Sequence, residues 1–278
     1  MPEFQYQGAA INYGDSHHGS PLILLHSGGS SSAQWRKTDE HLAGKYRLLT
    51  PDLYGHGGSD DWNHPAVLQH DDQAKLVAAV VKYAGLAAST IDIVGHSYGG
   101  AGAIRMMLRK LVNIRSLVLI EPMLARLLPE VGESELFSEY EYLAHGFLNR
   151  VTAGEKNDAW RFFLDYRNGE GHWDKFSEKT QTRFLSKTDA THKAFQSNLS
   201  NPTTLANIAS LNLPITIVCG ERTTAPDRRV TELLRDTLTN MRYAVIPGAE
   251  HMSPLTHPAE VAAIIERHLS DLVSGKWR

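Results

Sequence analysis

The chain has 278 residues, a formal net charge of −3 and 42% hydrophobic residues. This small net charge argues against a nucleic acid or an anionic membrane as partner, and we expect a small-molecule substrate instead. We also expect a monomer or homodimer. No apolar segment reaches transmembrane length and the stretch from Met1 lacks a signal-peptide pattern, which predicts a cytoplasmic protein. The chain has a single cysteine, Cys219, so a disulfide framework within the chain is excluded. Cys219 lies in an apolar run.

Strands and helices alternate through the first half of the chain. The run Leu22–Leu25 is continuously apolar, as expected of a strand that is covered on both faces. Gly and Ser residues then mark a loop, and short loops separate the elements that follow. The predicted elements are a hairpin over 4–15, a strand over 22–25, a helix over 35–42, a strand over 46–51 and a helix over about 65–83.

The stretch from Thr90 to Arg105 reads T-I-D-I-V-G-H-S-Y-G-G-A-G-A-I-R. A β-branched apolar run comes first, then a turn, then residues that suit a helix. This is the setting in which G-x-S-x-G forms a nucleophile elbow, with Ser97 at its tip. Gly95 and Gly99 are needed because a side chain at either position would clash with the neighbouring backbone.

The pattern changes after Pro122. No strand is evident from Met123 to about residue 206, where helical patterns carry many aromatic and charged residues. An insertion of this length with helical periodicity predicts a lid, because structureless loops this long are uncommon. The later predicted elements are strands over 116–120, 215–220 and 242–246 and helices over 226–238 and 258–273. We therefore predict an α/β fold with a mostly parallel central sheet covered by helices on both faces, a core of residues 1–122 and 214–278, and a helical cap of residues 123–213.

Four short motifs lie at the ends of predicted strands. They are His26-Ser27-Gly28-Gly29, Asp52-x-x-Gly55-x-Gly57-x-Ser59, the elbow at Ser97, and Gly248-Ala249-Glu250-His251-Met252-x-Pro254. Their types and order resemble the α/β-hydrolase family over nearly the whole chain. The resemblance implies that Ser97 is the nucleophile and His251 its base, because a serine hydroxyl needs a base to attack a carbonyl. Asp52 and its glycines are interpreted as a structural turn.

The resemblance also implies an oxyanion hole formed by the backbone N–H groups of Gly28 and Tyr98. Ser27 stands where the family usually has glycine, and its hydroxyl is a candidate substrate contact. Aromatic residues of the inserted segment are candidates for the core of the lid or for a wall that faces the substrate. The substrate-binding candidates are Ser27, Trp160, Phe163 and Met252. The Asn-Gly and Glu-Gly pairs within residues 162–173 predict a lid hinge.

Three carboxylates are candidates for the acid that orients His251. Most family members carry aspartate in a G-x-x-D turn, where this chain reads Gly220-Glu221-Arg222-Thr223. Glu121 ends the strand next to the elbow strand, from which some haloalkane dehalogenases and lipases take their acid, and we favour it. Asp227, a few residues beyond the usual position, is the alternative, although a carboxylate at a helix start is common for capping alone. Glu221 is the third candidate.

These residues predict a serine hydrolase that cleaves a carboxylic ester or lactone through an acyl-enzyme, with no metal and no organic cofactor. A carbon–carbon bond hydrolase of the meta-cleavage-product type and an acyltransferase or perhydrolase are alternatives, because they can use the same triad. Epoxide hydrolases and haloalkane dehalogenases carry aspartate where Ser97 stands. Loss of the usual acid keeps open a hydrolase-like ligand-binding protein. The histidines, including His17-His18, show no zinc-ligand spacing.

Overall fold

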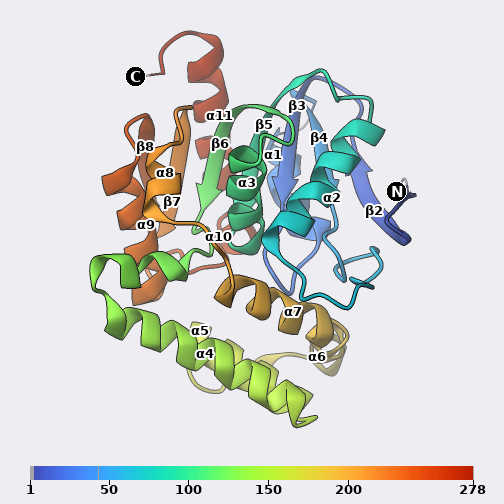
Figure 1. Cartoon of the computed structure of the whole chain (residues 1–278), viewed down its shortest axis with the longest axis vertical. Helices are drawn as coiled ribbons and strands as arrows, with labels where there is room; N and C mark the ends of the chain where they lie inside the picture. The colour runs from blue at the N-terminus through green and yellow to red at the C-terminus, as the bar shows by residue number, and fades with distance from the viewer. Residues whose placement is uncertain (1–2, 43, 278) are drawn as a thin grey trace.

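A single mixed sheet forms the centre of the molecule (Figure 1). The computed structural model describes residues 3–42 and 44–277, so Met1 and Pro2, the first residues of the stretch without a signal-peptide pattern, lie outside it. The strand order is β1-β2-β4-β3-β5-β6-β7-β8, with β2 antiparallel to both β1 and β4 and all later neighbours parallel. The strands are β1 (Glu3–Tyr6), β2 (Ala9–Asp15), β3 (Ser20–Leu25), β4 (Tyr46–Pro51), β5 (Thr90–His96), β6 (Asn113–Ile120), β7 (Ile215–Gly220) and β8 (Met241–Ile246). The predicted fold class is confirmed.

Helices cover both faces of this sheet (Figure 1). In β3, Ile23 and Leu25 belong to one core cluster and Leu22 and Leu24 to the other, so the strand is buried on both faces. This explains its continuous apolar run, because successive side chains of a strand point to opposite faces. One face is covered by α1 (Arg36–Leu42) and α11 (Pro258–Val273), and the other by α2 (His70–Tyr83), α3 (Tyr98–Leu108) and α9 (Ala225–Thr237).

The helix expected from about residue 65 begins at residue 70. Before it, the Trp62 indole N–H donates to the Ala66 carbonyl at 2.7 Å and holds this stretch in a non-helical loop. Gln69 and Asp72 then form a capping box, in which each side chain accepts a hydrogen bond from the backbone N–H of the other. The predicted boundary was wrong because side-chain capping, and not the apolar pattern, sets the start of α2.

Apart from the short helix α8 (Leu205–Ala209), the helices and turns between β6 and β7 lie beneath the sheet in Figure 1, next to the carboxyl ends of the parallel strands. The predicted cap, residues 123–213, falls on this segment. Its helices are η2 (Ala125–Leu127), η3 (Pro129–Val131), α4 (Ser134–Thr152), α5 (Lys156–Asn168), η4 (Trp173–Lys175), α6 (Glu178–Leu185), α7 (Thr188–Leu199) and α8 (Leu205–Ala209). We call α4 to α8 the inserted helices. Across the described residues no helix is both long and apolar enough to cross a membrane.

The predicted lid hinge is only partly a turn. Residues 162–168 belong to α5, which ends at Gly169 with a φ of 92°. The Asp165 side chain accepts hydrogen bonds from the backbone N–H groups of Gly171 (3.1 Å) and Trp173 (2.9 Å), so the turn that follows is tied back to α5. The hinge prediction is therefore wrong for residues 162–168, where the helical pattern outweighed the turn-forming pairs.

Candidate active site

Ser97 lies at a sharp turn between β5 and α3, with φ 52° and ψ −114°. This left-handed conformation is uncommon for a residue with a side chain. An ideal Cβ on Gly95 would lie 2.6 Å from the Gly100 Cα, and one on Gly99 would lie 2.6 Å from the carbonyl oxygens of Leu25 and His26. Both glycines are therefore required by close backbone contacts, and the turn has the geometry of the predicted elbow.

We expect Gly99→Ala to lower the free energy of unfolding by about 3 kcal/mol, because the added methyl group meets backbone that cannot move aside. Gly102→Ala is a matched control in the same helix, since a Cβ there would have nothing within 4 Å. That control should stabilise the protein by about 0.5–1 kcal/mol through helix propensity. Urea unfolding of both variants measures the difference, and equal midpoints would contradict the packing argument.

His251 connects Ser97 to Glu121. Its Nε2 lies 3.0 Å from the Ser97 Oγ, and its Nδ1 lies 2.7 Å from the Glu121 Oε2. All three residues are buried. The arrangement gives the hydroxyl a proton acceptor and gives the imidazole a carboxylate on its other nitrogen, which fixes the tautomer that can accept the proton.

Glu121 is held in place by two further hydrogen bonds. The backbone N–H of Gly220 donates to its Oε1 at 2.6 Å, and the Thr223 hydroxyl donates to its Oε2 at 2.7 Å. Thr223 occupies the position where most family members carry the acid, and here its hydroxyl supports Glu121, the residue that directly follows β6. Glu121 itself has a positive φ of 41°, an uncommon conformation that turns the chain out of the strand.

The other two acid candidates differ in their distance from the imidazole. The Asp227 Oδ2 lies 3.5 Å from the His251 Nδ1 and is buried. Glu221 instead accepts a hydrogen bond from the backbone N–H of Gly248 at 2.7 Å and is exposed. The structure thus brings Glu121 and Asp227 to His251 and directs Glu221 elsewhere.

Gly28 and Tyr98 lie side by side next to Ser97. An ideal Cβ on Gly28 would be 3.7 Å from the Tyr98 Cβ and 3.5 Å from the Ala194 Cβ of α7. Within the described residues neither backbone N–H donates a turn or loop hydrogen bond. Two free N–H groups beside the serine are the donors that an oxyanion needs.

Buried polar side chains hold the loop that carries Gly28. The Ser27 hydroxyl donates to the Gln34 Oε1 at 2.8 Å and so supports the loop, and its role as a substrate contact stays a prediction. The backbone N–H of Leu53 donates to the His26 Nε2 at 3.1 Å, and that of Gly29 donates to the His56 Nε2 at 3.1 Å. Burial lowers the pKa of His26 to about 4 and that of His56 to about 3, so both rings stay neutral acceptors.

The predicted aromatic contacts lie mainly in the core of the inserted helices. Trp160 is buried, and its indole N–H donates to the Thr188 hydroxyl at 2.9 Å. Its ring reaches within 3.1 Å of an ideal Cβ on Gly29, so it packs against the loop beside the serine. Phe163 packs edge-on against Trp160 with ring centres 5.9 Å apart. Met252 is half-buried at the start of α10 (Ser253–Thr256). Their role as substrate contacts stays a prediction.

Arg167 of α5 is a site residue that the sequence pattern did not reveal. Its guanidinium forms an ion pair with the Asp227 carboxylate, and both side chains are only 7% exposed. The two positions are 60 residues apart in the chain, and neither is part of a motif. Arg167 is in α5 and Asp227 in α9, and only the folded chain brings them together, so no local signal could have found this pair.

Ligand atoms of Glu121, Asp227 and His251 lie within 4.8 Å of one another, which is close enough to surround a metal ion. Thr223 and Arg167 already bond the two carboxylates, and His251 bonds both Ser97 and Glu121. We interpret the cluster as a set of mutually bonded groups, and the absence of a metal stays a prediction.

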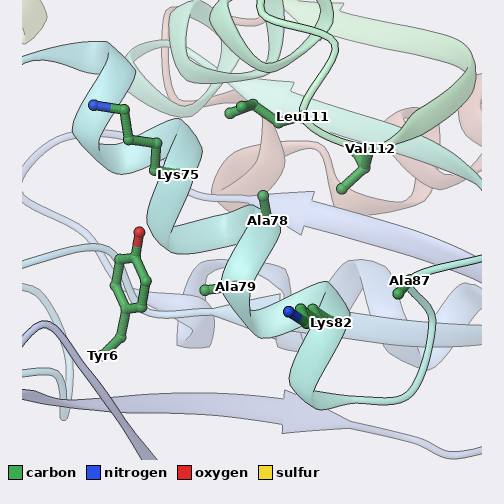
Figure 2. Close-up of a pocket in the computed structure, with 8 residues that line it drawn as sticks. All are labelled: Tyr6, Lys75, Ala78, Ala79, Lys82, Ala87, Leu111 and Val112. Atoms are coloured by element: carbon green, nitrogen blue, oxygen red, sulfur yellow. The ribbon is translucent and has the colours of Figure 1, made fainter.

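A separate shallow cavity of about 310 Å³ lies on another part of the surface and contains none of the candidate site residues. Figure 2 shows that α2 supplies one side of it, with Lys75 and Lys82 at either end and two alanines between them. Its lining residues are Tyr6, Lys75, Ala78, Ala79, Lys82, Ala87, Leu111 and Val112.

A mostly parallel sheet of this order, with a strained serine between a strand and a helix, is the architecture of an α/β hydrolase. The model of the alpha/beta hydrolase family matches residues 22–264, and the chain belongs to this family. The family resemblance inferred from the four motifs is therefore confirmed.

Known relatives include enzymes of several kinds. A 2-hydroxymuconate semialdehyde hydrolase of Pseudomonas sp. (strain CF600) is 33% identical over 116 residues, which is 41% of this chain and only 40% of that relative's length. A pimeloyl-acyl-carrier-protein methyl ester esterase of Nitrosomonas europaea is 24% identical over 270 residues, covering 93% of this chain and 99% of the relative. An esterase structure from Exiguobacterium antarcticum superimposes with a TM-score of 0.75 at 16% identity, covering 95% of this chain and 96% of that one, which shows a common fold.

Proposed function

We propose that this protein is a serine hydrolase that cleaves a carboxylic ester or lactone of a small molecule. The observation that carries the proposal is the hydrogen-bonded chain from Ser97 through His251 to Glu121. An ester carbonyl is the electrophile that such a nucleophile attacks, and a water molecule can complete the reaction. The esterase relative that aligns over 93% of the chain supports the same reaction class.

In the proposed mechanism, the Ser97 Oγ attacks the ester carbonyl while the His251 Nε2 accepts its proton. The negative charge that develops on the carbonyl oxygen is stabilised by the N–H groups of Gly28 and Tyr98. His251 then donates the proton to the leaving alkoxide, which gives an alcohol and an acyl-Ser97. Water, deprotonated by His251, attacks the acyl-enzyme and releases the acid. Glu121 holds the ring and stabilises its charged form throughout.

We further propose that the inserted helices form a cap over this site. Ala194 and Trp160 of these helices pack against the loop that carries Gly28 and Gly29, so they bound the space beside the serine. Ser97 and His251 are 6% and 8% exposed, as expected under such a cover. Mostly apolar side chains in this cover favour a small or medium, apolar acyl group.

We also propose a cytoplasmic location. The single cysteine is buried, which agrees with this location.

A stopped-flow assay with p-nitrophenyl acetate and butyrate tests this proposal. We expect a burst of p-nitrophenol close to one equivalent of enzyme, because an acyl-enzyme forms before water releases it. A fluorophosphonate should label one peptide, the one that contains Ser97. No burst and no labelling would contradict the serine-hydrolase mechanism.

A carbon–carbon bond hydrolase is the second candidate function, favoured by the likeness to the Pseudomonas semialdehyde hydrolase. Such an enzyme would use the same three residues on a vinylogous diketone, after the substrate is ketonised. A ketonised intermediate whose formation depends on pH, seen by rapid-scan absorbance, distinguishes it from an esterase. Labelling of Ser97 together with no ester turnover would favour this candidate.

A further inference from the structure

Two carboxylates face the same nitrogen of His251. The Glu121 Oε2 lies 2.7 Å from Nδ1, and the Asp227 Oδ2 lies 3.5 Å from it. A single carboxylate is enough to orient the ring in a catalytic triad. The second carboxylate therefore adds a negative charge that the proposed reaction does not need.

Arg167 supplies the opposite charge. Its guanidinium pairs with Asp227, which also accepts a hydrogen bond from the Thr224 hydroxyl at 2.9 Å. Burial raises the pKa of Asp227, but the charges of Arg167 and His251, together with the hydrogen bonds from Arg167 and Thr224, outweigh burial and hold this pKa below its usual range. Asp227 belongs to the core helix α9 and Arg167 to the inserted helix α5. The charge balance at the catalytic histidine thus depends on a contact between the inserted helices and the core.

The remaining titratable groups around His251 leave this balance unchanged. The His96 ring lies 5.0 Å from that of His251, and burial holds the pKa of His96 well below its usual value, so it stays neutral. Burial raises the pKa of both Tyr140 and Tyr166, which face the ion pair from α4 and α5. Glu250, which is half-buried, is paired with the exposed Arg222 at 3.6 Å.

We propose that Arg167 is a positioning residue. It neutralises Asp227, so that Glu121 alone orients His251. His251 is then oriented as a base only while α5 packs on the core. This inference rests on the proposed function. With both partners present, the charges of Glu121, Asp227 and Arg167 sum to −1, as in an ordinary triad. Without Arg167, Asp227 still accepts the Thr224 hydrogen bond and faces His251, which both favour its ionised form; the sum is then −2, which favours protonated His251. Without Asp227 the sum is zero, which disfavours it.

The pH dependence of fluorophosphonate labelling at Ser97 tests the proposal, because labelling requires neutral His251. The experiment can be done without knowing the substrate. We expect the acid limb of the labelling rate to move up by about one pH unit in Arg167→Met and down by a similar amount in Asp227→Asn. In the double variant the charges again sum to −1, so the limb should return close to its wild-type position.

Arg161→Met is the matched control, because Arg161 is also on α5 but has a side chain that is 45% exposed and pairs with Asp158 and Asp174 at the surface. It should leave the acid limb where it is. Unshifted limbs in Arg167→Met and Asp227→Asn, or a double variant no closer to wild type than the single variants, would overturn the inference. If Arg167→Met does not fold, the acid limb of Asp227→Asn is compared with that of the double variant. A limb that does not return towards its wild-type position in the double variant would overturn the inference. Failure of the wild type to label would instead overturn the proposed function.

Discussion

Ser97→Ala should lower kcat for p-nitrophenyl esters by roughly 10⁶-fold, to the level of the buffer. The serine hydroxyl is the atom that attacks, and no other hydroxyl is hydrogen-bonded to the His251 Nε2 within the described residues. The fold should persist, because the side chain loses a single hydrogen bond and the strained backbone at position 97 is unchanged. Steady-state kinetics and a thermal melt on the same preparation separate these two effects.

Ser253→Ala is the control for this experiment. Ser253 lies two residues after His251, is fully buried, and its hydroxyl has no partner in the described chain. Its removal should leave kcat within about twofold, since no step of the proposed mechanism uses it. An active Ser97→Ala protein, or an equal loss in both variants, would refute Ser97 as the nucleophile.

The fold could be predicted because the functional motifs and the strands occur together in the sequence. The apolar run before Ser97 forms β5, and the glycines on either side of Ser97 have no room for a side chain. In a parallel sheet the carboxyl ends of neighbouring strands meet at one edge. The loops that carry Gly28, Ser97, Glu121 and His251 must therefore converge once the strand order is known.

The apolar pattern failed where hydrogen bonds of side chains a few residues apart decide the structure. The start of α2 depends on the cap formed by Gln69 and Asp72, and the turn after α5 depends on the Asp165 side chain. The role of Ser27 depends on Gln34, which lies seven residues further along the chain. Each of these contacts forms only in the folded chain, so composition and periodicity carry no trace of them.

The carboxylate that orients His251 is the clearest example of what the sequence pattern could not decide. From sequence alone Glu121, Asp227 and Glu221 are all near the strand ends that surround His251. Geometry removes Glu221, but two carboxylates stay within 3.5 Å of the imidazole. Their partners distinguish them: Glu121 accepts hydrogen bonds from neutral donors and from His251, whereas Asp227 is neutralised by an arginine.

Glu121→Gln should therefore lower kcat by about 10⁴-fold. A glutamine amide can donate to the His251 Nδ1, which stabilises the tautomer whose Nε2 carries the proton and cannot accept one from Ser97. The amide also cannot offset the charge of the imidazolium that forms during the attack. Fluorophosphonate labelling should slow in parallel, because it needs the same tautomer, and a thermal melt monitors the fold.

Glu221→Gln is the control and should keep kcat within about twofold, because this exposed carboxylate accepts a hydrogen bond from the Gly248 N–H and lies away from His251. Near-normal kcat in Glu121→Gln together with a large loss in Asp227→Asn would assign the acid to Asp227.

Adding Thr223→Asp to Glu121→Gln is a gain-of-function version of the same test. It places a carboxylate at the position most family members use, next to the side chain at position 121, since the Thr223 hydroxyl already reaches the Glu121 Oε2. Recovery of part of the lost kcat would show that His251 accepts its acid from either strand end.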